Sequence, residues 1–120
     1  MRIAVSATGK DLNSQVDSRF SRAHYFIIVD TERDGFIVSD NTQNVNALQG
    51  AGIQAAKNVA DMNVQAVITG NLGPKAFATL QAAGIDIYTG FSGTVGEAVE
   101  ALNSGKLLKT SKPSVEGHWT

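Results

Sequence analysis

Short apolar runs and longer stretches with helical spacing alternate along the chain. The short runs are rich in β-branched and aromatic residues, which is typical of β-strands; they cover residues 3–7, 25–29, 36–38, 64–69 and 85–88. The longer stretches repeat apolar residues with the period of an amphipathic helix; they cover residues 53–60, 74–83 and 95–102. The pattern predicts an α/β fold with the element order β-β-β-α-β-α-β-α.

The lengths of the connections predict how these strands pair. Only the turn-forming residues 30–35 separate the second and third strands, so these two should form an antiparallel hairpin. Strands that are joined through helices pair in parallel by right-handed crossovers. We therefore expect a mixed five-stranded sheet with helices on its faces.

Individual residues mark the ends of the predicted helices. Pro74 suits a first helical turn, where its missing N–H has no cost. Asn63, just after the helix predicted over residues 53–60, can end that helix in the left-handed conformation. Thr94 and Glu97 have the spacing of a capping box, which predicts the start of the last helix between them.

Polar stretches between these elements predict the loops. Residues 8–22 exceed the usual loop length of a compact domain, but Val16 and Phe20 can anchor them, so we expect partial order. Residues 44–52 form a polar loop with glycines ahead of the first helix. The polar stretch 106–120 is expected to be poorly ordered.

Composition limits the class of protein. The length of 120 residues suits a single domain, and the absence of cysteine excludes disulfides, thiolate zinc sites and cysteine-ligated iron–sulfur clusters. The formal net charge of −1 argues against nucleic-acid binding through a basic surface. The sequence shows neither a signal peptide nor the ~20 apolar residues of a membrane helix, so we expect a cytoplasmic protein that binds no membrane.

Loops that follow parallel strands meet at one edge of a sheet, where open α/β sheets bind ligands. One such loop, residues 70–75, opens a helix, and the free N–H groups of a helix N-terminus favour anions. Glycines let a ligand approach the backbone, and basic side chains add positive charge. The residues that we expect to bind an anion are Arg19, Arg22, His24, Gly50, Gly52, Gly70, Asn71, Gly73 and Lys75.

Two roles are open for His24. A lone histidine at the start of a strand can ligate a metal, or it can serve as a structural hydrogen-bond partner. We therefore keep His24 as a candidate metal ligand. His118 lies in the polar tail, and we assign it no role.

Familiar catalytic motifs do not fit the chain. Thr8-Gly9-Lys10-Asp11 resembles the end of a phosphate-binding Walker loop, but the leading glycine is missing and Asp11 stands where Ser or Thr binds magnesium. The element order is similar to that of ribonuclease-H-like folds, whose nucleases hold two metal ions with carboxylates. The first predicted strand carries no carboxylate, so we do not expect a hydrolase.

Four ordered blocks of sequence resemble the dinitrogenase iron–molybdenum cofactor biosynthesis family. Residues 16–26, VDSRFSRAHYF, are similar to the family signature V-D-x-R-F-G-R-A-x-x-F. The other blocks are residues 50–56 (GAGIQAA), 70–77 (GNLGPKAF) with 83–85 (AGI), and 94–98 (TVGEA) with 105–107 (GKL). Ser21 stands where the family usually has glycine, and since serine tolerates positive φ less well, we expect a local difference in that loop.

The resemblance implies a family domain over residues 1–109, followed by a polar tail over residues 110–120. It implies a three-layer α/β/α fold with a ribonuclease-H-like motif. It also implies binding, storage or transfer of an anionic metal–sulfur cluster instead of catalysis, as in the NifX-like carriers and the molybdenum–copper orange protein of this family. The cluster would be of the Mo–Fe–S or Mo–Cu–S type, or absent from the isolated protein, and the partners would be proteins that donate or accept it.

Two other functions stay open. The chain could be a metal-free regulatory module that docks on a partner protein through an exposed patch containing Phe20, Tyr25 and Phe91. It could also bind a phosphate or a nucleotide at the same helix N-terminus. We expect three further aromatic residues in the core: Phe26, Phe36 and Phe77.

Overall fold

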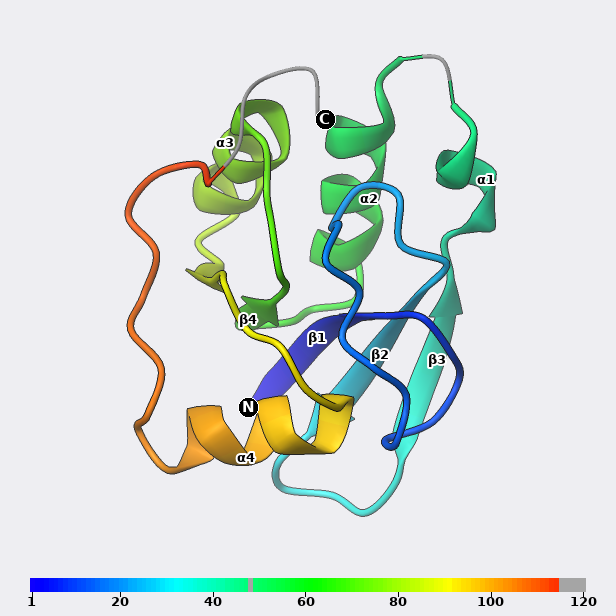
Figure 1. Ribbon diagram of the computed structural model, residues 1–120. Coiled ribbons are helices and arrows are strands. Elements are labelled where there is room, and N and C mark those ends of the chain that lie inside the picture. Colours follow the sequence, from blue (N-terminus) through cyan, green and yellow to red (C-terminus); the bar gives the residue numbers. More distant parts are fainter. Residues whose placement is uncertain (48, 115–120) are drawn as a thin grey trace.

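The computed structural model describes residues 1–47 and 49–114. Its elements are β1 (Arg2–Ala7), β2 (Tyr25–Asp30), β3 (Phe36–Asp40), α1 (Thr42–Val45), α2 (Ala51–Ala60), β4 (Ala66–Ile68), α3 (Pro74–Ala82), β5 (Asp86–Tyr88) and α4 (Val95–Asn103) (Figure 1). The predicted order is confirmed, and the short helix α1 is an addition to it. No helix of the described ranges is long and apolar enough to cross a membrane.

The five strands form one mixed sheet in the order β3-β2-β1-β4-β5. β2 is antiparallel to both of its neighbours, whereas β1, β4 and β5 are parallel to one another. The mixed five-stranded sheet and its hairpin are therefore confirmed. The three parallel strands end at the same edge of the sheet, which we call the carboxyl edge, and α2, α3 and α4 all begin there.

Helices cover both faces of the sheet. Ala4 of β1 lies in a core cluster with side chains of α2 and α3, whereas its neighbours Ile3 and Val5 lie in a second cluster with side chains of α4. This alternation follows from the two-residue period of a strand. It confirms the three-layer α/β/α arrangement. Burial of each large apolar side chain stabilises the fold by about 1.5–3 kcal/mol.

The predicted helix ends are found in the structure. The Thr94 hydroxyl accepts a hydrogen bond from the Glu97 N–H (3.1 Å), and the Glu97 carboxylate accepts one from the Thr94 N–H (2.9 Å). Hydrogen bonds from Thr94 to the Glu97 carboxylate, that of the backbone N–H above all, lower the pKa of Glu97. Asn63 adopts the left-handed conformation with φ of 58°, and Pro74 begins α3.

Two expectations about the β3 region are wrong. The predicted loop from residue 44 overlaps the end of α1, and at the start of α1 the Asp40 carboxylate accepts from both the N–H (2.8 Å) and the hydroxyl (2.6 Å) of Thr42. Phe36 was expected in the core but is 39% exposed. It lies on the edge strand β3, and α4, which packs on β1, is two strands away from it.

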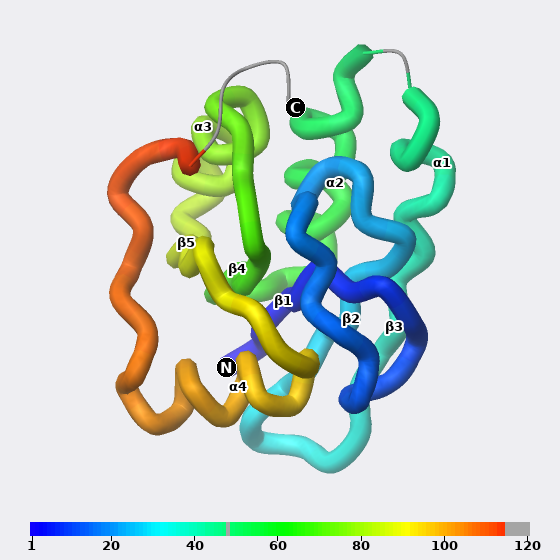
Figure 2. Tube along the Cα trace, viewed as in Figure 1, coloured from blue at the N-terminus to red at the C-terminus, as the bar shows by residue number. Residues whose placement is uncertain are grey.

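Residues 106–114, which we call the strap, run along the outer side of β5 (Figure 2). The Thr110 N–H donates to the Ile87 carbonyl (2.6 Å), and the Thr110 hydroxyl accepts from the Thr89 N–H (2.9 Å). The expectation of poor order is therefore wrong for the strap. Its contacts cross the predicted boundary between residues 109 and 110, and the position of that boundary stays a prediction. Residues 115–120 of the predicted tail lie outside the described residues.

Candidate functional site

The loop after β1 crosses the loops that follow the other parallel strands at the carboxyl edge. An isolated parallel bridge joins Arg19 to Asn71, and an antiparallel one joins Gln15 to Thr94. Beneath the loop, the buried hydroxyls of Ser6 and Thr69 are 2.7 Å apart, and the Ser6 Oγ also donates to the loop at the Asp17 carbonyl. The predicted convergence of loops is present, and buried hydrogen bonds hold it in place.

The N-termini of α2 and α3 offer backbone donors at this edge. Their N-cap residues are Gly50, in the left-handed conformation with φ of 79°, and Gly73; no side chain caps either helix within the described ranges. The first N–H groups of a helix have no intrahelical acceptor, and the helix dipole adds positive potential there. Gly52 is buried in the first turn of α2, and Lys75 is exposed in the first turn of α3.

The N-terminus of α4 is different, because its donors are already used. The Val95 N–H donates to the Ser14 carbonyl (2.9 Å), and the Gly96 N–H donates to the Leu12 carbonyl (2.9 Å). The Glu97 N–H is taken by the capping box. An anion at the carboxyl edge would therefore meet α2 and α3.

These two helices lie side by side, and the segment that contains Arg19 is anchored between them and the sheet. Phe20 is 1% exposed and belongs to the same core cluster as Ala55 of α2, Ala76 of α3 and Leu72 ahead of α3. This burial brings the backbone on both sides of Phe20 to the start of α3. It also means that Phe20 cannot contribute to the exposed aromatic patch proposed from the sequence.

The backbone N–H and the side-chain Nε of Arg19 contact Asp17, whereas the end of its side chain is exposed. Asp17, whose side chain is only 6% exposed, accepts a hydrogen bond from the Arg19 N–H (2.9 Å) and pairs with the Arg19 Nε at 3.7 Å. The Arg19 side chain itself is 44% exposed. The ion pair engages Nε, and among the described residues no hydrogen bond joins the terminal nitrogens of this guanidinium to a protein acceptor. These nitrogens can therefore face an anion.

Arg22 has a different role from the one that the sequence suggested. Its Nη1 donates to the carbonyls of Asn44 (3.3 Å), Val45 (3.2 Å) and Ala47 (2.8 Å), at the C-terminal end of α1. A cation at this position satisfies carbonyls that the helix leaves without donors. Arg22 therefore joins the first loop to the segment that leads into α2.

Two buried asparagines, which the sequence analysis did not single out, complete this connection. The Asn41 Nδ2 donates to the carbonyls of Ser21 (3.1 Å) and Ala23 (2.8 Å), and its Oδ1 accepts from the Asn44 Nδ2 (2.8 Å). Ser21 is buried and does not have positive φ, since Asn63 is the one non-glycine residue of the described ranges that does. Serine therefore fits this position without backbone strain.

We expect Arg22→Ala to lower the free energy of unfolding by about 1–2 kcal/mol, because it leaves partly buried carbonyls without donors. Urea denaturation followed by circular dichroism would measure the change. Arg33→Ala is the matched control, since Arg33 is 84% exposed and its ion pair with Asp30 is 4.0 Å long; its effect should stay below about 0.5 kcal/mol. Equal losses in both variants would contradict the role assigned to Arg22.

His24 lies on the surface at the start of β2. Its carbonyl accepts from the Asn41 N–H (2.9 Å), and Lys10 lies over the ring of the adjacent Tyr25 at 5.3 Å. Hydrogen bonds from Thr42, above all that of its hydroxyl, lower the pKa of nearby Asp40. The described residues contain no group of three side chains suited to hold a metal ion, so His24 as a metal ligand stays a prediction.

Gly70 and Asn71 connect the loops to one another. A Cβ on Gly70 would lie 2.6 Å from the Cα of Ser18, so the two backbones approach too closely for any side chain. The Asn71 Nδ2 donates to the Ser18 carbonyl (3.1 Å), and the Asn71 carbonyl accepts from the Phe20 N–H (3.2 Å). These two residues therefore fix the position of the Arg19 segment.

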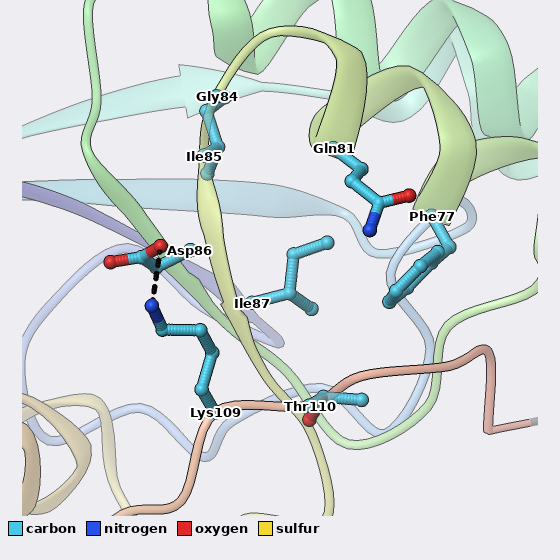
Figure 3. Close-up of a pocket in the computed structure, with 8 residues that line it drawn as sticks. All are labelled: Phe77, Gln81, Gly84, Ile85, Asp86, Ile87, Lys109 and Thr110. Carbon is cyan, nitrogen blue, oxygen red and sulfur yellow. Dashed lines mark ion pairs between the residues drawn. The ribbon is translucent and has the colours of Figure 1, made fainter.

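The structure contains cavities away from the carboxyl edge. One of about 200 Å³ lies between α3, β5 and the strap, and Phe77, Ile87 and Thr110 are among its lining residues (Figure 3). Another of about 240 Å³ lies at the β2–β3 turn. Neither is lined by a residue of the predicted site.

One family model and several known proteins match most of this chain. The model of the family described as dinitrogenase iron-molybdenum cofactor matches residues 1–105. The apo form of the orange protein from Desulfovibrio gigas is 38% identical, with a TM-score of 0.92 over 95% of this chain and 96% of that one. An NMR structure of a provisionally assigned NifB protein from Thermotoga is 40% identical, with a TM-score of 0.81 over 95% and 98% of the two chains. An uncharacterized protein of Methanocaldococcus jannaschii is 31% identical over 81% of this chain and 84% of its own.

Proposed function

The chain belongs to the dinitrogenase iron-molybdenum cofactor family, and on this premise we propose that it binds, stores or transfers an anionic metal–sulfur cluster and catalyses no reaction. The observation that carries the proposal is the pair of N-termini without side-chain caps on the neighbouring helices α2 and α3, together with the bridge that places the backbone of Arg19 beside Asn71 ahead of α3. The cargo would be a cluster of the Mo–Fe–S or Mo–Cu–S type.

The chemistry of this edge suits such a cargo. A sulfide-rich cluster spreads negative charge over many sulfur atoms, and backbone N–H groups together with a guanidinium fork can meet several of them at once. The chain has no cysteine, so the sulfur around the metals would belong to the cargo itself. Recognition would then rest on charge and hydrogen bonds to the outer sulfides.

Each part of the site has a stated role in this proposal. The first-turn amides of α2, which include Gly52, and those of α3, which include Lys75, donate to the cluster. The side chains of Arg19 and Lys75 supply the positive charge. His24 is the protein side chain that could ligate a metal directly. Three further residues do not contact the cargo but fix the positions of the loops that bind it: Gly70, Asn71 and Arg22.

The similarity to the orange protein of Desulfovibrio gigas, solved in an apo form, supports a carrier that folds before it is loaded. We propose that loading and delivery involve donor and acceptor proteins in the cytoplasm, without nucleic acid or membrane. The net charge of −1 fits a protein that recognises one compact anion instead of a polyanionic chain.

Anaerobic reconstitution tests the proposal. Purified protein would be mixed with tetrathiomolybdate and copper(I), and separately with iron and sulfide, and then desalted. We expect a visible chromophore and stoichiometric metal and sulfide in at least one mixture. Lys75→Ala should retain the cargo about two- to fivefold less well, as expected for one partly screened charge.

Lys57→Ala is the matched control, since Lys57 lies in the last turn of α2, at the end opposite to the proposed site. It should retain as much cargo as the natural chain. A colourless, metal-free product in both mixtures would remove the proposal and leave the metal-free regulatory module. A thermal shift with nucleotides, without metal retention, would instead favour the phosphate-binding alternative.

A further inference from the structure

The strap ends at the loop that leads into α3. The Leu72 N–H donates to the Ser114 Oγ (2.8 Å), and the Ser114 N–H donates to the Leu72 carbonyl (2.9 Å). Both backbone groups of Leu72 are thus engaged by one residue that lies 42 positions later in the chain.

Leu72 is central to the loop 70–73. Its side chain is 1% exposed in the core cluster beneath α2 and α3. On one side, the Asn71 carbonyl accepts the N–H of Phe20, next to Arg19; on the other, the Gly73 carbonyl accepts the N–H of Phe77, the first backbone bond of α3. A shift of Leu72 would therefore displace both the Arg19 segment and the start of α3.

Between Leu107, which packs against the core cluster beside α4, and Thr110, the strap is attached lightly. Lys109 and Asp86 form an exposed ion pair of 3.2 Å, and Leu108 is 91% exposed. Between the strap and α3 lies the cavity of about 200 Å³ instead of packed side chains, with the Lys109–Asp86 pair at its rim (Figure 3). The strap therefore meets the β5 segment through the hydrogen bonds of Thr110 and the loop ahead of α3 through those of Ser114.

We propose that the strap holds the loop 70–73 in its binding conformation and that Ser114 is the positioning residue through which it does so. Loss of this contact lets Leu72 move, loosens the first turn of α3 and weakens the grip on the cargo. The part that concerns the cargo rests on the proposed function; the part that concerns the loop does not.

Amide hydrogen exchange on the metal-free protein tests the loop directly. We expect Ser114→Ala to speed exchange of the Phe77 and Phe20 N–H groups about five- to tenfold, the effect of one lost hydrogen bond on local opening. Ser114→Thr, which keeps a hydroxyl acceptor, should restore protection. Lys109→Ala removes a strap contact away from Leu72, so it should leave both amides as protected as in the natural chain.

A second measurement follows release of cargo loaded as tetrathiomolybdate with copper(I). Faster release from Ser114→Ala, but not from Lys109→Ala, would support the complete proposal. Faster exchange in a protein whose natural chain retains no cargo would keep the positioning role and reject the proposed function. Unchanged protection of Phe77 and Phe20 in Ser114→Ala would overturn the positioning role, whatever the cargo does.

Discussion

Gly70→Ala is expected to lower the free energy of unfolding by about 2–3 kcal/mol, because the new methyl group has no space. It would lie 2.6 Å from the Cα and 2.8 Å from the carbonyl oxygen of Ser18, and both are backbone atoms that cannot turn aside. The two loops must separate, and the bridge between Arg19 and Asn71 must lengthen. Urea denaturation would measure the loss, which corresponds to a fall in Tm of roughly 10 °C.

Gly96→Ala is the matched control for this substitution. Gly96 lies inside α4, where an added Cβ would be 3.4 Å from the Leu12 carbonyl oxygen, an ordinary contact. Alanine also stabilises a helix relative to glycine by up to about 1 kcal/mol, so stability should be unchanged or higher. A Gly70→Ala protein as stable as the natural chain would contradict the close approach of the loops and, with it, the placement of Arg19.

Arg19→Ala is expected to weaken retention of the cargo about 10- to 100-fold, the range for one or two hydrogen bonds from a charged group. Its effect on unfolding should be below about 0.5 kcal/mol, because the Arg19 side chain is 44% exposed and Asp17 keeps the hydrogen bond from the backbone N–H of residue 19. Equilibrium dialysis of protein loaded with tetrathiomolybdate and copper(I) would measure retention. Arg19→Lys should be intermediate, since an ammonium keeps the charge but lacks the planar fork.

Substitutions of the two arginines in the first loop should distinguish an effect on cargo binding from an effect on stability. Arg22→Ala should affect stability first, whereas Arg19→Ala should affect retention first, although both remove the same charge. Arg33→Ala supplies a third variant of equal charge change at the far end of the sheet. If all three lose cargo equally, net charge and not a site explains retention, and the assignment of Arg19 fails.

Local patterns were sufficient to predict most of the fold. Strand and helix periods, the capping box of Thr94 and Glu97, and the left-handed Asn63 depend on residues close together in sequence, and each is found in the structure. The convergence of loops at the carboxyl edge followed from the crossover rule. The edge of the sheet at which the candidate site lies could therefore be predicted from the sequence.

Interactions between distant residues were not accessible in this way. An arginine in a loop looks the same whether it faces an anion, as Arg19 can, or holds three carbonyls more than twenty positions away, as Arg22 does. Phe36 has the composition of a core residue, and only the strand order shows that it lies at an uncovered edge. Ser114 is one polar residue in a polar stretch, and its pairing with Leu72 leaves no local signal.

The two edges of the sheet differ in whether another segment of the chain covers them. In the part of the chain that the structure describes, no strand pairs with the outer side of β3, where the side chains at 36–38 are exposed, whereas the strap covers β5. An unpaired strand edge presents N–H and C=O groups to which another strand can add. We expect a chain cut after residue 105 to present two such edges instead of one. The strap thus protects one edge of the sheet from the addition of a further strand and leaves the β3 edge as the place where one could add.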